Sequence, residues 1–593
     1  MPNLSHDDLK RWKDRVNSVV KYAQADGRKE SYQEFLDMYN NRFNVSVRGA
    51  LDQVNVNHVF PNVRIKSSYL AQKKPKFFVS PRKPKWNDAA QLIEAALLSV
   101  WGIGDVAWTM RMVLLDASIF PHGAIRVGYQ FDEDRFSDNV KDFPYVKRVS
   151  PRDIFWDLNI TDSNPRTGRF MFERFYTIKD QLREQGFKYV DDIDPIGFES
   201  DYFRRKEQGG RVRSVVRSGV DQEGEIVEIF RIQDKIERLN IWISMNGDAP
   251  HFVEDWKLPL KSFDYHILQF NPVPDQIFAM SDVEVYRNQQ IELNKIRTYM
   301  INHINRASRR WVTQKGTMTP DEKNALLESG DQMITEITGD PSRIIPLSDA
   351  PMPADFFRVQ ELIQQDIRQL SGVSEFELSA SIPSGDTTAT AAALVQSATR
   401  RRTDDANAVY EKFLTDTAKD IILILQEHVP LDFWINVTDR EQVAKIQGLT
   451  EFDGNFFRVK KNQIQGDMIV TIDPGSMKEQ SDPLRVQQFN QALSLLITQP
   501  AILQRLDVDK LLLNIAELYE FPQDIVKSQE QFAAEQQEQL MMQMAAGGQG
   551  MPAGETPEIQ NLGTPPAQSA PDLGQLLAQA MNLGGVGGAV EKF

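Results

Sequence analysis

The chain has 593 residues, of which 41% are hydrophobic and 25% are charged, and its formal net charge is −15. These proportions are typical of a folded protein, and the length is enough for about four domains. The absence of cysteine excludes disulfide bonds, thiolate zinc sites and thiol catalysis. The acidic balance argues against a protein that grips nucleic acid with its whole surface.

The sequence contains no apolar run that predicts a membrane span. Its first residues are polar and lack the apolar core of a signal peptide. The longest apolar candidate, residues 95–108, is shorter than the roughly 20 residues needed to cross a bilayer and contains Asp105. We therefore expect synthesis in the cytoplasm and no membrane partner.

The N-terminal region predicts two charged amphipathic helices, at residues 4–25 and 28–42. Residues 62–87 then contain eight lysines and arginines, several aromatic rings and no acidic residue. Basic residues interleaved with aromatic ones can bind nucleic acid. A solvated face, or an interface with an acidic neighbour, explains the same pattern and is the more common outcome.

An α+β body is predicted for residues 90–280, because helical and strand-like patterns are mixed there. The helices are expected at residues 89–101, 105–115 and 177–185, and the extended segments at 123–131, 144–156, 223–245 and 265–270.

The middle of the chain predicts two helices separated by an insert. In each helix, apolar residues recur at three- and four-residue spacing and mark one face. The first face comprises Leu293, Ile296, Met300, Ile304 and Ala307, and the second comprises Phe356, Val359, Ile363, Ile367 and Leu370. The insert, residues 311–353, predicts short strands at 333–338 and 344–347, broken by glycine and proline.

The two helices carry opposite charge, which favours packing side by side. Residues 282–310 contain six Lys/Arg and three Asp/Glu, hence +3, whereas residues 353–377 contain two and five, hence −3. Exposed pairs contribute only about 0–1 kcal/mol each, so an ordinary helical subdomain also fits the pattern.

A small polar loop at residues 379–388 precedes a helical pattern that continues to about residue 428. That helix contains Arg400, Arg401 and Arg402, which cannot all face one way. Contact with two neighbours, contact with DNA, and a solvated face paired with Asp404 and Asp405 all remain open. Strands at 433–437 and 468–472, helices within 484–546 and a disordered tail from residue 547 complete the chain.

No catalytic or metal-binding constellation is recognisable. The seven histidines are scattered and are expected on the surface or at caps. The acidic clusters at residues 191–194 and 404–405 lack the ligand spacing of a calcium loop, and no phosphate-binding loop or nucleophile elbow occurs. We expect no catalytic residue, no metal and no cofactor.

The order of these parts resembles the portal proteins of tailed double-stranded DNA bacteriophages, from about residue 7 to residue 543. Three stretches carry the resemblance: Val54-Asn-Val-Asn-His-Val-Phe-Pro-Asn-Val with Lys76-Phe-Phe-Val-Ser-Pro, the Asn294-Lys-Ile-Arg helix that leads to Trp311, and Leu370-Ser-Gly-Val-Ser with Thr388-Ala-Thr-Ala-Ala-Ala.

The resemblance implies a mainly α fold with an α+β body, arranged as wing, stem, clip and crown and assembled as a ring, usually of twelve subunits. It assigns residues 1–280 to the wing, 281–310 and 353–378 to two stem helices, 311–352 to the clip, 379–388 to a tunnel loop, 389–480 to a long wing helix with a β segment, 481–546 to the crown and 547–593 to the disordered tail.

The resemblance also implies a structural protein, located in the virion at one capsid vertex and assembled in the host cytoplasm. Its ring would be the channel for genome packaging and ejection, through which double-stranded DNA passes non-specifically. The implied partners are the major capsid protein, the scaffolding protein, the terminase large subunit and the head–tail adaptor or neck proteins.

The same resemblance implies contact residues of three kinds. The DNA-facing tunnel loop comprises Ser379, Ser381, Pro383, Ser384, Gly385, Asp386, Thr387 and Thr388. The clip contacts are Trp311, Asp321, Glu322, Glu328, Asp331, Glu336, Asp340 and Arg343. The subunit or DNA contacts are Arg306, Arg309, Arg310, Arg400, Arg401 and Arg402. Three Lys/Arg against seven Asp/Glu give residues 311–352 a charge of −4, which favours a basic partner.

Two alternatives belong to other functional classes. A DNA-processing enzyme of a packaging system would need a phosphate-binding loop or a carboxylate metal cluster. A non-viral helical scaffold or adaptor would use the two central helices simply to bind another helix.

Overall fold

The computed structural model describes most of residues 4–472, and these all lie in the first of the two units into which contacts divide the chain, residues 1–477 and 478–593. The residues outside the description are 1–3, 26–27, 44, 46–51, 72–74, 104, 131–142, 161–162, 198–224, 248, 308–310, 314, 317, 329–339, 341, 343, 347–352, 373–388, 431, 438–439, 447, 454 and 473–593. The predicted tunnel loop, crown and tail therefore lie outside the described residues, as does the strand predicted at 333–338.

Three helices open the chain: α1 (His6–Ala25), α2 (Arg28–Tyr39) and α3 (Val59–Ala71). Ser5 caps α1, because its Oγ accepts the backbone N–H of Asp8 at 3.2 Å. The apolar residues of α1 recur at helical spacing and are buried with strand residues Phe155, Phe172 and Ile232. The prediction of two amphipathic helices at the N-terminus is confirmed.

The sheet that α1 covers has five antiparallel strands in the order β4-β5-β6-β7-β8. The strands are β4 (Ile154–Trp156), β5 (Phe170–Ile178), β6 (Ile226–Asp234), β7 (Leu239–Ile243) and β8 (Phe252–Asp255), and α6 (Lys179–Glu184) follows β5. The strand pair predicted at residues 223–245 is confirmed as β6 and β7.

A second antiparallel sheet has the order β3-β2-β9. Its strands are β2 (Gly123–Gln130), β3 (Phe143–Val149) and β9 (Tyr265–Leu268). The prediction of one extended segment at residues 144–156 is wrong, because a turn closed by the 2.9 Å bond from Asp153 N–H to the Ser150 carbonyl separates β3 from β4. The two halves of that segment join different sheets.

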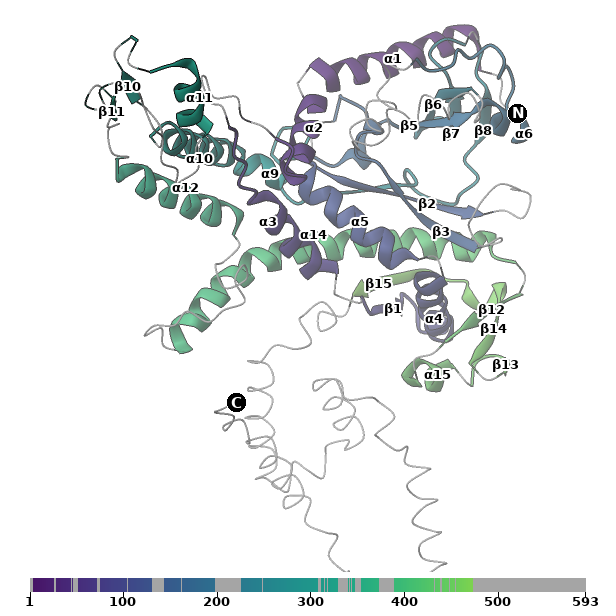
Figure 1. Ribbon diagram of the computed structural model, residues 1–593. Helices are drawn as coiled ribbons and strands as arrows, with labels where there is room; N and C mark the ends of the chain where they lie inside the picture. Colours follow the sequence, from purple (N-terminus) through teal and green to yellow (C-terminus); the bar gives the residue numbers. More distant parts are fainter. Residues whose placement is uncertain are drawn as a thin grey trace, which may run out of the picture. The chain divides into compact units, whose positions relative to one another are not determined.

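The largest core surrounds three helices, α4 (Asn87–Ile103), α5 (Val106–Ile119) and α14 (Ala389–His428). The 40 residues of α14 correspond to a length of about 60 Å, and the helix runs alongside β2 and β3 in Figure 1. Among the described helices none is by itself long and apolar enough to cross a membrane, although the bent pair Pro84–Gly102 and Val106–Ile119 meets the test by length and composition. Most apolar side chains of that pair are in the core of this unit, although Trp108 is 57% exposed.

The chain after α14 forms small sheets against the same core. The elements are β12 (Asp432–Asn436), α15 (Arg440–Ile446), β13 (Phe452–Asp453), β14 (Phe456–Lys460) and β15 (Met468–Ile472). β15 pairs antiparallel with β1 (Phe77–Pro81), which joins segments almost four hundred residues apart in the sequence. The predicted strands at 433–437 and 468–472 are confirmed.

The region predicted as two helices with an insert begins with α9 (Asp282–Val285) and α10 (Arg287–Ala307). The backbone leaves the helical conformation at Tyr286, so the prediction of a single helix from residue 282 is wrong. The insert contains β10 (Trp311–Thr313), α11 (Pro320–Glu328) and β11 (Ile344–Pro346), and α12 (Asp355–Ser371) follows. The strand predicted at 344–347 is confirmed as β11, whereas β10, its antiparallel pairing with β11, and α11 were not predicted.

Candidate functional site

The helices α10 and α12 lie side by side (Figure 1) and share an apolar contact. Leu293, Ile363 and Ile367 are buried in one cluster, and the Arg297 guanidinium donates to Gln360 Oε1 at 3.3 Å. Two of the five residues of each predicted apolar face are therefore buried, Leu293 and Met300 on α10 and Ile363 and Ile367 on α12. Ile304 and Leu370, predicted on the same faces, are instead 53% and 41% exposed.

The other buried side of α10 is polar. Gln290, Asn294, Thr298 and Asn302 recur every four residues and are all buried. Each accepts one backbone N–H from residues 52–58, the extended segment that precedes α3: His58 N to Gln290 Oε1 at 3.2 Å, Val56 N to Asn294 Oδ1 at 3.0 Å, Val54 N to Thr298 Oγ1 at 3.1 Å and Asp52 N to Asn302 Oδ1 at 3.3 Å. We call these four side chains the α10 polar ladder.

The spacing of the polar ladder follows from backbone geometry. Four helical residues rise about 6 Å, and two residues of an extended chain advance about 6.6 Å. Every second N–H of the segment therefore meets every fourth residue of the helix. Two ladder side chains also donate to the segment: Gln290 Nε2 donates to the Val56 carbonyl at 2.5 Å, and Asn302 Nδ2 donates to the Asp52 carbonyl at 2.7 Å.

The ladder satisfies the backbone of an extended segment without a partner strand, and it fixes the register between that segment and α10. Apolar periodicity does not reveal the ladder, because the helical residues that form it are polar. The signal was present as polar residues at four-residue spacing in the helix and as the alternation Val54-Asn-Val-Asn-His in the segment.

The start of α10 is held by charged contacts to the N-terminal helices. Arg287 binds Glu34 of α2 through two bonds, both of 2.9 Å. Lys66 of α3 lies 2.8 Å from Asp282, and the Ser281 hydroxyl caps α9 while donating to the Ile119 carbonyl. The base of the helical pair is therefore fixed to the body by groups from α2, α3 and α5.

Large apolar side chains remain exposed on the helical pair. On α10, Tyr299 and Ile304 are 52% and 53% exposed, and on α12, Phe357, Val359 and Leu362 are 59%, 38% and 49% exposed. Large apolar side chains that remain in solvent at several positions of two neighbouring helices are typical of a region that another protein covers.

Within the insert, the described acidic residues have local roles. Glu322 accepts the Thr319 N–H at 2.6 Å while Thr319 Oγ1 accepts from Glu322 N, which is a capping box at the start of α11. Asp321 is exposed in the same first turn. Asp340 accepts two bonds from Ser342, and these bonds lower the pKa of its carboxyl group.

The remaining predicted contact residues cannot be placed by their side chains. Asp331, Glu336, Arg343, Arg309, Arg310 and the loop residues from Ser379 to Thr388 lie outside the described residues. Trp311 is on β10, Arg306 on α10, Glu328 on α11, and Arg400, Arg401 and Arg402 on α14, but their side chains lie outside the described part of the structure.

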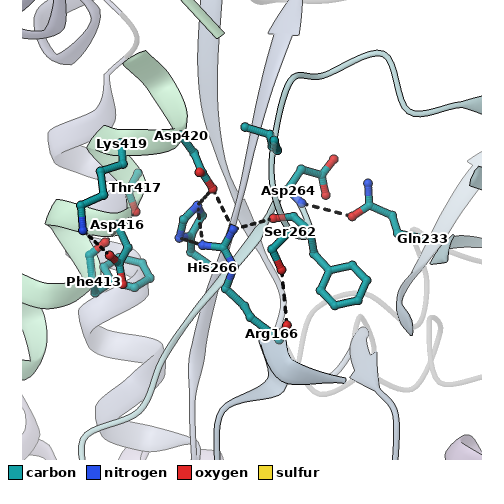
Figure 2. A network of polar contacts seen from close by, with 12 residues as sticks. Arg166, Gln233, Ser262, Asp264, His266, Phe413, Asp416, Thr417, Lys419 and Asp420 are labelled. Carbon is teal, nitrogen blue, oxygen red and sulfur yellow. Dashed lines mark hydrogen bonds and ion pairs between the residues drawn. The ribbon is translucent and has the colours of Figure 1, made fainter. Parts of the chain in front are cut away.

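The long helix α14 is joined to the body by a polar triad, shown in Figure 2, in which two side chains are buried and the third is partly buried. Arg166, from the 3-10 turn Pro165–Thr167, places Nη2 2.8 Å from Asp420 Oδ2 of α14 and 2.9 Å from the Phe263 carbonyl oxygen. His266 of β9 places Nε2 2.9 Å from the same Asp420 oxygen. We call Arg166, His266 and Asp420 the α14 triad.

The bonds define the protonation of the triad. Arg166 Nη1 lies 2.8 Å from His266 Nδ1, and because a guanidinium only donates, Nδ1 accepts and the ring proton is on Nε2. Burial lowers the pKa of His266, and the charge of Arg166 lowers it further. Burial alone would raise the pKa of Asp420, but the hydrogen bond from His266 and the charge of Arg166 outweigh it and leave that pKa below its usual value.

Histidine placement differs from the prediction. His122, His251 and His266 are buried rather than on the surface. His251 lies 2.9 Å from the Lys188 carbonyl and 2.8 Å from Ser244 Oγ, so it satisfies polar groups inside the fold. A local sequence pattern could not show this, because the partners come from other elements.

The acidic clusters have structural neighbours in the described residues. Asp191 lies 2.5 Å from Arg183, and the hydrogen bond and charge of Arg183 lower the pKa of this carboxyl group. Asp194 accepts from Asn246 at 3.1 Å. Within the described ranges, no group of three or more histidine, aspartate or glutamate side chains is arranged to hold a metal ion.

A family model described as Phage SU10 portal protein matches residues 129–582, well over half of the chain. The chain belongs to this phage portal family. The matched residues include α10, α12 and the whole of α14. No curated protein matches the sequence.

Family membership confirms the resemblance drawn from the order of the sequence elements. It gives this portal protein a structural role, at a capsid vertex of the virion. The described part of the chain is a mixed α/β protein, with one five-stranded, two three-stranded and two two-stranded sheets beside the helices.

Proposed function

We propose that copies of this portal protein form a ring of about twelve subunits, the number usual among the portal proteins it resembles, whose axial channel admits the genome during packaging and releases it at ejection. In this proposal the ring first binds the terminase large subunit and later the head–tail adaptor or neck proteins. The major capsid protein and the scaffolding protein surround it at the vertex. Family membership supports the role in general terms.

The observation that carries the ring proposal is the exposed apolar surface of the helical pair. Tyr299, Ile304, Phe357 and Leu362 face solvent on α10 and α12 of a single chain, and burying a large apolar side chain contributes about 1.5–3 kcal/mol. The base of the pair is fixed to the body by Arg287 and the polar ladder. A neighbouring copy that covers this surface would repeat the same contact around a closed ring.

The proposed parts follow the order of the chain. Residues 1–280 and 389–480 form the wing, 281–310 and 353–378 the stem, 311–352 the clip and 481–546 the crown, while 547–593 remain a tail. The clip charge of −4 suits a basic partner. Glu322 is less available to a basic partner, because its carboxylate already caps α11.

The proposed channel contact with DNA is weak. The loop at residues 379–388 is small and polar and contains one acidic residue, Asp386, which repels phosphate. Arg306, Arg309, Arg310 and the three arginines of α14 are proposed as subunit or DNA contacts. Loose, non-specific contact allows duplex DNA to slide in both directions.

The ring proposal is tested by sedimentation. The wild-type chain should sediment as an assembly many times heavier than the 67.8 kDa monomer. Ile304→Asp with Phe357→Asp should release monomers, because a buried unpaired charge is strongly unfavourable. Ile236→Asp, on an exposed turn of the five-stranded sheet, is the matched control and should leave the assembly intact. A wild-type monomer at every concentration and salt would overturn the proposal.

The channel contact is tested separately by deleting residues 383–387. The expected result is an intact ring with impaired packaging or retention of DNA. Particles with normal genome content would remove the role assigned to this loop.

A further inference from the structure

Among the described residues, one face of the two-stranded sheet of β1 and β15 is not covered. Phe77 and Val79 on β1 are buried in the core opposite Ile472 and Val470 on β15. The alternate residues point the other way. On that side Phe78 and Ile469 are 44% and 45% exposed.

Positive charge gathers beside this face. Arg82, Lys83 and Lys85 follow β1 directly and are all exposed. The ammonium groups of Lys83 and Lys85 lie 5.6 and 4.9 Å from the centre of the Trp86 ring, a distance at which a cation is attracted to the ring. Two positive charges are therefore held near one indole.

The indole itself has a fixed position. Gly466 lies against it, so closely that a Cβ atom on Gly466 would come within 2.8 Å of Trp86 Cγ. Gly466 has φ of +149°, a conformation that side chains with a Cβ rarely adopt. The close approach of Gly466 on one side and the two lysines near the ring leave little room for a nucleic-acid base to stack on Trp86.

The charges near Trp86 are not neutralised within the described residues. Arg82 lies 3.1 Å from Asp467, but both side chains are more than half exposed, so water screens the pair. Lys83 and Lys85 contact Trp86 and have no carboxylate partner in the described part of the chain. In a chain of net charge −15, this is a locally positive surface.

We propose that this basic face, made by Phe78, Arg82, Lys83, Lys85, Trp86 and Ile469, binds the phosphate backbone of duplex DNA. The choice of DNA as the polyanion rests on the proposed function of the ring. The contact is distinct from the proposed tunnel loop, which is acidic rather than basic.

Charge and distance support this ligand. Screening limits electrostatic interactions to about 8 Å at physiological salt, so the ligand responds to the local lysines and not to the net charge of the chain. Duplex DNA carries one negative charge per about 1.7 Å of its axis, which places several phosphates within reach of the two ammonium groups. Lysine ammonium groups act as point charges that bind phosphate and do not distinguish between base sequences, so the contact is non-specific.

The test uses the full-length protein with a covalently closed circular duplex, which has no end to enter a channel. The double variant Lys83→Gln with Lys85→Gln is compared with wild type by gel shift over a range of salt concentrations. The slope of log K against log salt should become shallower by about 1.8, because each lost phosphate contact contributes about 0.9. The affinity at low salt should fall at least about tenfold.

Matched controls separate this site from general charge loss. Lys257→Gln with Lys261→Gln removes the same charge from another exposed segment and should leave the slope unchanged. Lys83→Arg with Lys85→Arg should restore it. Equal binding by wild type and the Lys83/Lys85 glutamine variant, or an equal loss in both glutamine variants, would overturn the inference.

The gel-shift experiment tests the basic face whether or not a ring forms. If sedimentation shows no ring but the Lys83/Lys85 glutamine variant still loses its contact with circular DNA, the proposed channel fails and the basic face stands. If the ring forms and packages DNA but the circular duplex binds equally well to both proteins, the basic face fails and the channel stands.

Discussion

The helices α10 and α14 are attached to the same body in opposite ways. α14 buries a continuous apolar face, with Phe413, Leu414, Ile421 and Leu425 in the largest core cluster. α10 instead presents the polar ladder to residues 52–58 and buries its apolar residues mainly against α12 and the N-terminal helices. The body therefore holds α14 through a large apolar contact and α10 through hydrogen bonds that fix its register.

The two attachments have different effects: the apolar contact of α14 stabilises the fold, and the hydrogen bonds of α10 fix its position. Apolar contact is non-directional, so the α14 interface stabilises the fold without itself specifying a hydrogen-bond register. A hydrogen bond adds only about 0.5–1.5 kcal/mol net, but an unpaired buried partner costs about 1–3 kcal/mol. A register shift of α10 would leave the four buried side chains of the ladder, and the four N–H groups from which they accept, without their partners. We infer that the ladder fixes where α10 lies relative to the body, which a repeated subunit contact requires.

The largest effect should come from the apolar attachment of α14. Leu414 is fully buried in the main core, so Leu414→Ala should lower the free energy of unfolding by about 2–5 kcal/mol. Denaturant unfolding followed by circular dichroism measures this. Ile236→Ala, at an exposed turn, should change stability by less than about 0.5 kcal/mol. Similar losses in both variants would contradict the account of the α14 core.

A smaller effect is expected in the ladder. Asn294→Ala leaves the Val56 N–H without its acceptor and should cost about 1–3 kcal/mol. Amide hydrogen exchange should quicken at Val56 and Val54 before it quickens in α14. Asn288→Ala, exposed on the same helix, should change neither property. Unchanged exchange at residues 52–58 in the Asn294 variant would contradict the register function of the ladder.

The α14 triad should make stability depend on pH. The pKa of His266 is below that of an unfolded histidine, about 6.5. The unfolded state therefore takes up a proton first as the pH falls, so stability is full above pH 6.5 and declines below it. The loss is at most about 1.4 kcal/mol per pH unit for each histidine. His251 and His58 share this direction, because burial lowers their pKa values as well.

His266→Gln tests the contribution of the triad to that decline. The slope of unfolding free energy between pH 7 and pH 5 should be shallower in the variant than in wild type. His6→Gln, an exposed residue on α1, should leave the slope as it is. A slope that His266→Gln does not change would mean that the triad adds nothing to the pH dependence.

The smallest effect is expected between α10 and α12. The contact from Arg297 to Gln360 is 3.3 Å long and partly exposed, so Arg297→Gln should cost less than about 1 kcal/mol. Thermal unfolding of wild type and variant measures the change. A loss as large as that of Leu414→Ala would show that polar contacts, not Leu293, Ile363 and Ile367, hold the helical pair together.

Sequence periodicity predicted the elements whose apolar side faces a core. α1, α4, α5 and α14 appeared in the sequence because their buried residues follow helical spacing, and β6 and β7 because of their strand-forming composition. Periodicity failed where burial is polar, as in the α10 ladder and at His266. It also cannot show which distant strands pair, as β1 and β15 do.

The start of α11 was predictable but was missed. Thr319-Pro-Asp-Glu322 has the order of a capping residue, a proline in the first turn and a reciprocal acid. Because the insert has a net negative charge, Asp321 and Glu322 were interpreted as contacts to a partner and not as residues of a helix start. The order of parts along the chain carried the family assignment, which no single motif could have supported.

The central claim, a ring that guides DNA, is tested most directly by electron microscopy of the purified full-length protein viewed down its axis. The account predicts closed rings with an axial channel, and a reconstruction in which α10 and α12 of adjacent copies contact each other through Tyr299, Ile304 and Phe357. Isolated single chains, or rings whose subunits meet elsewhere and leave that apolar surface in solvent, would contradict it.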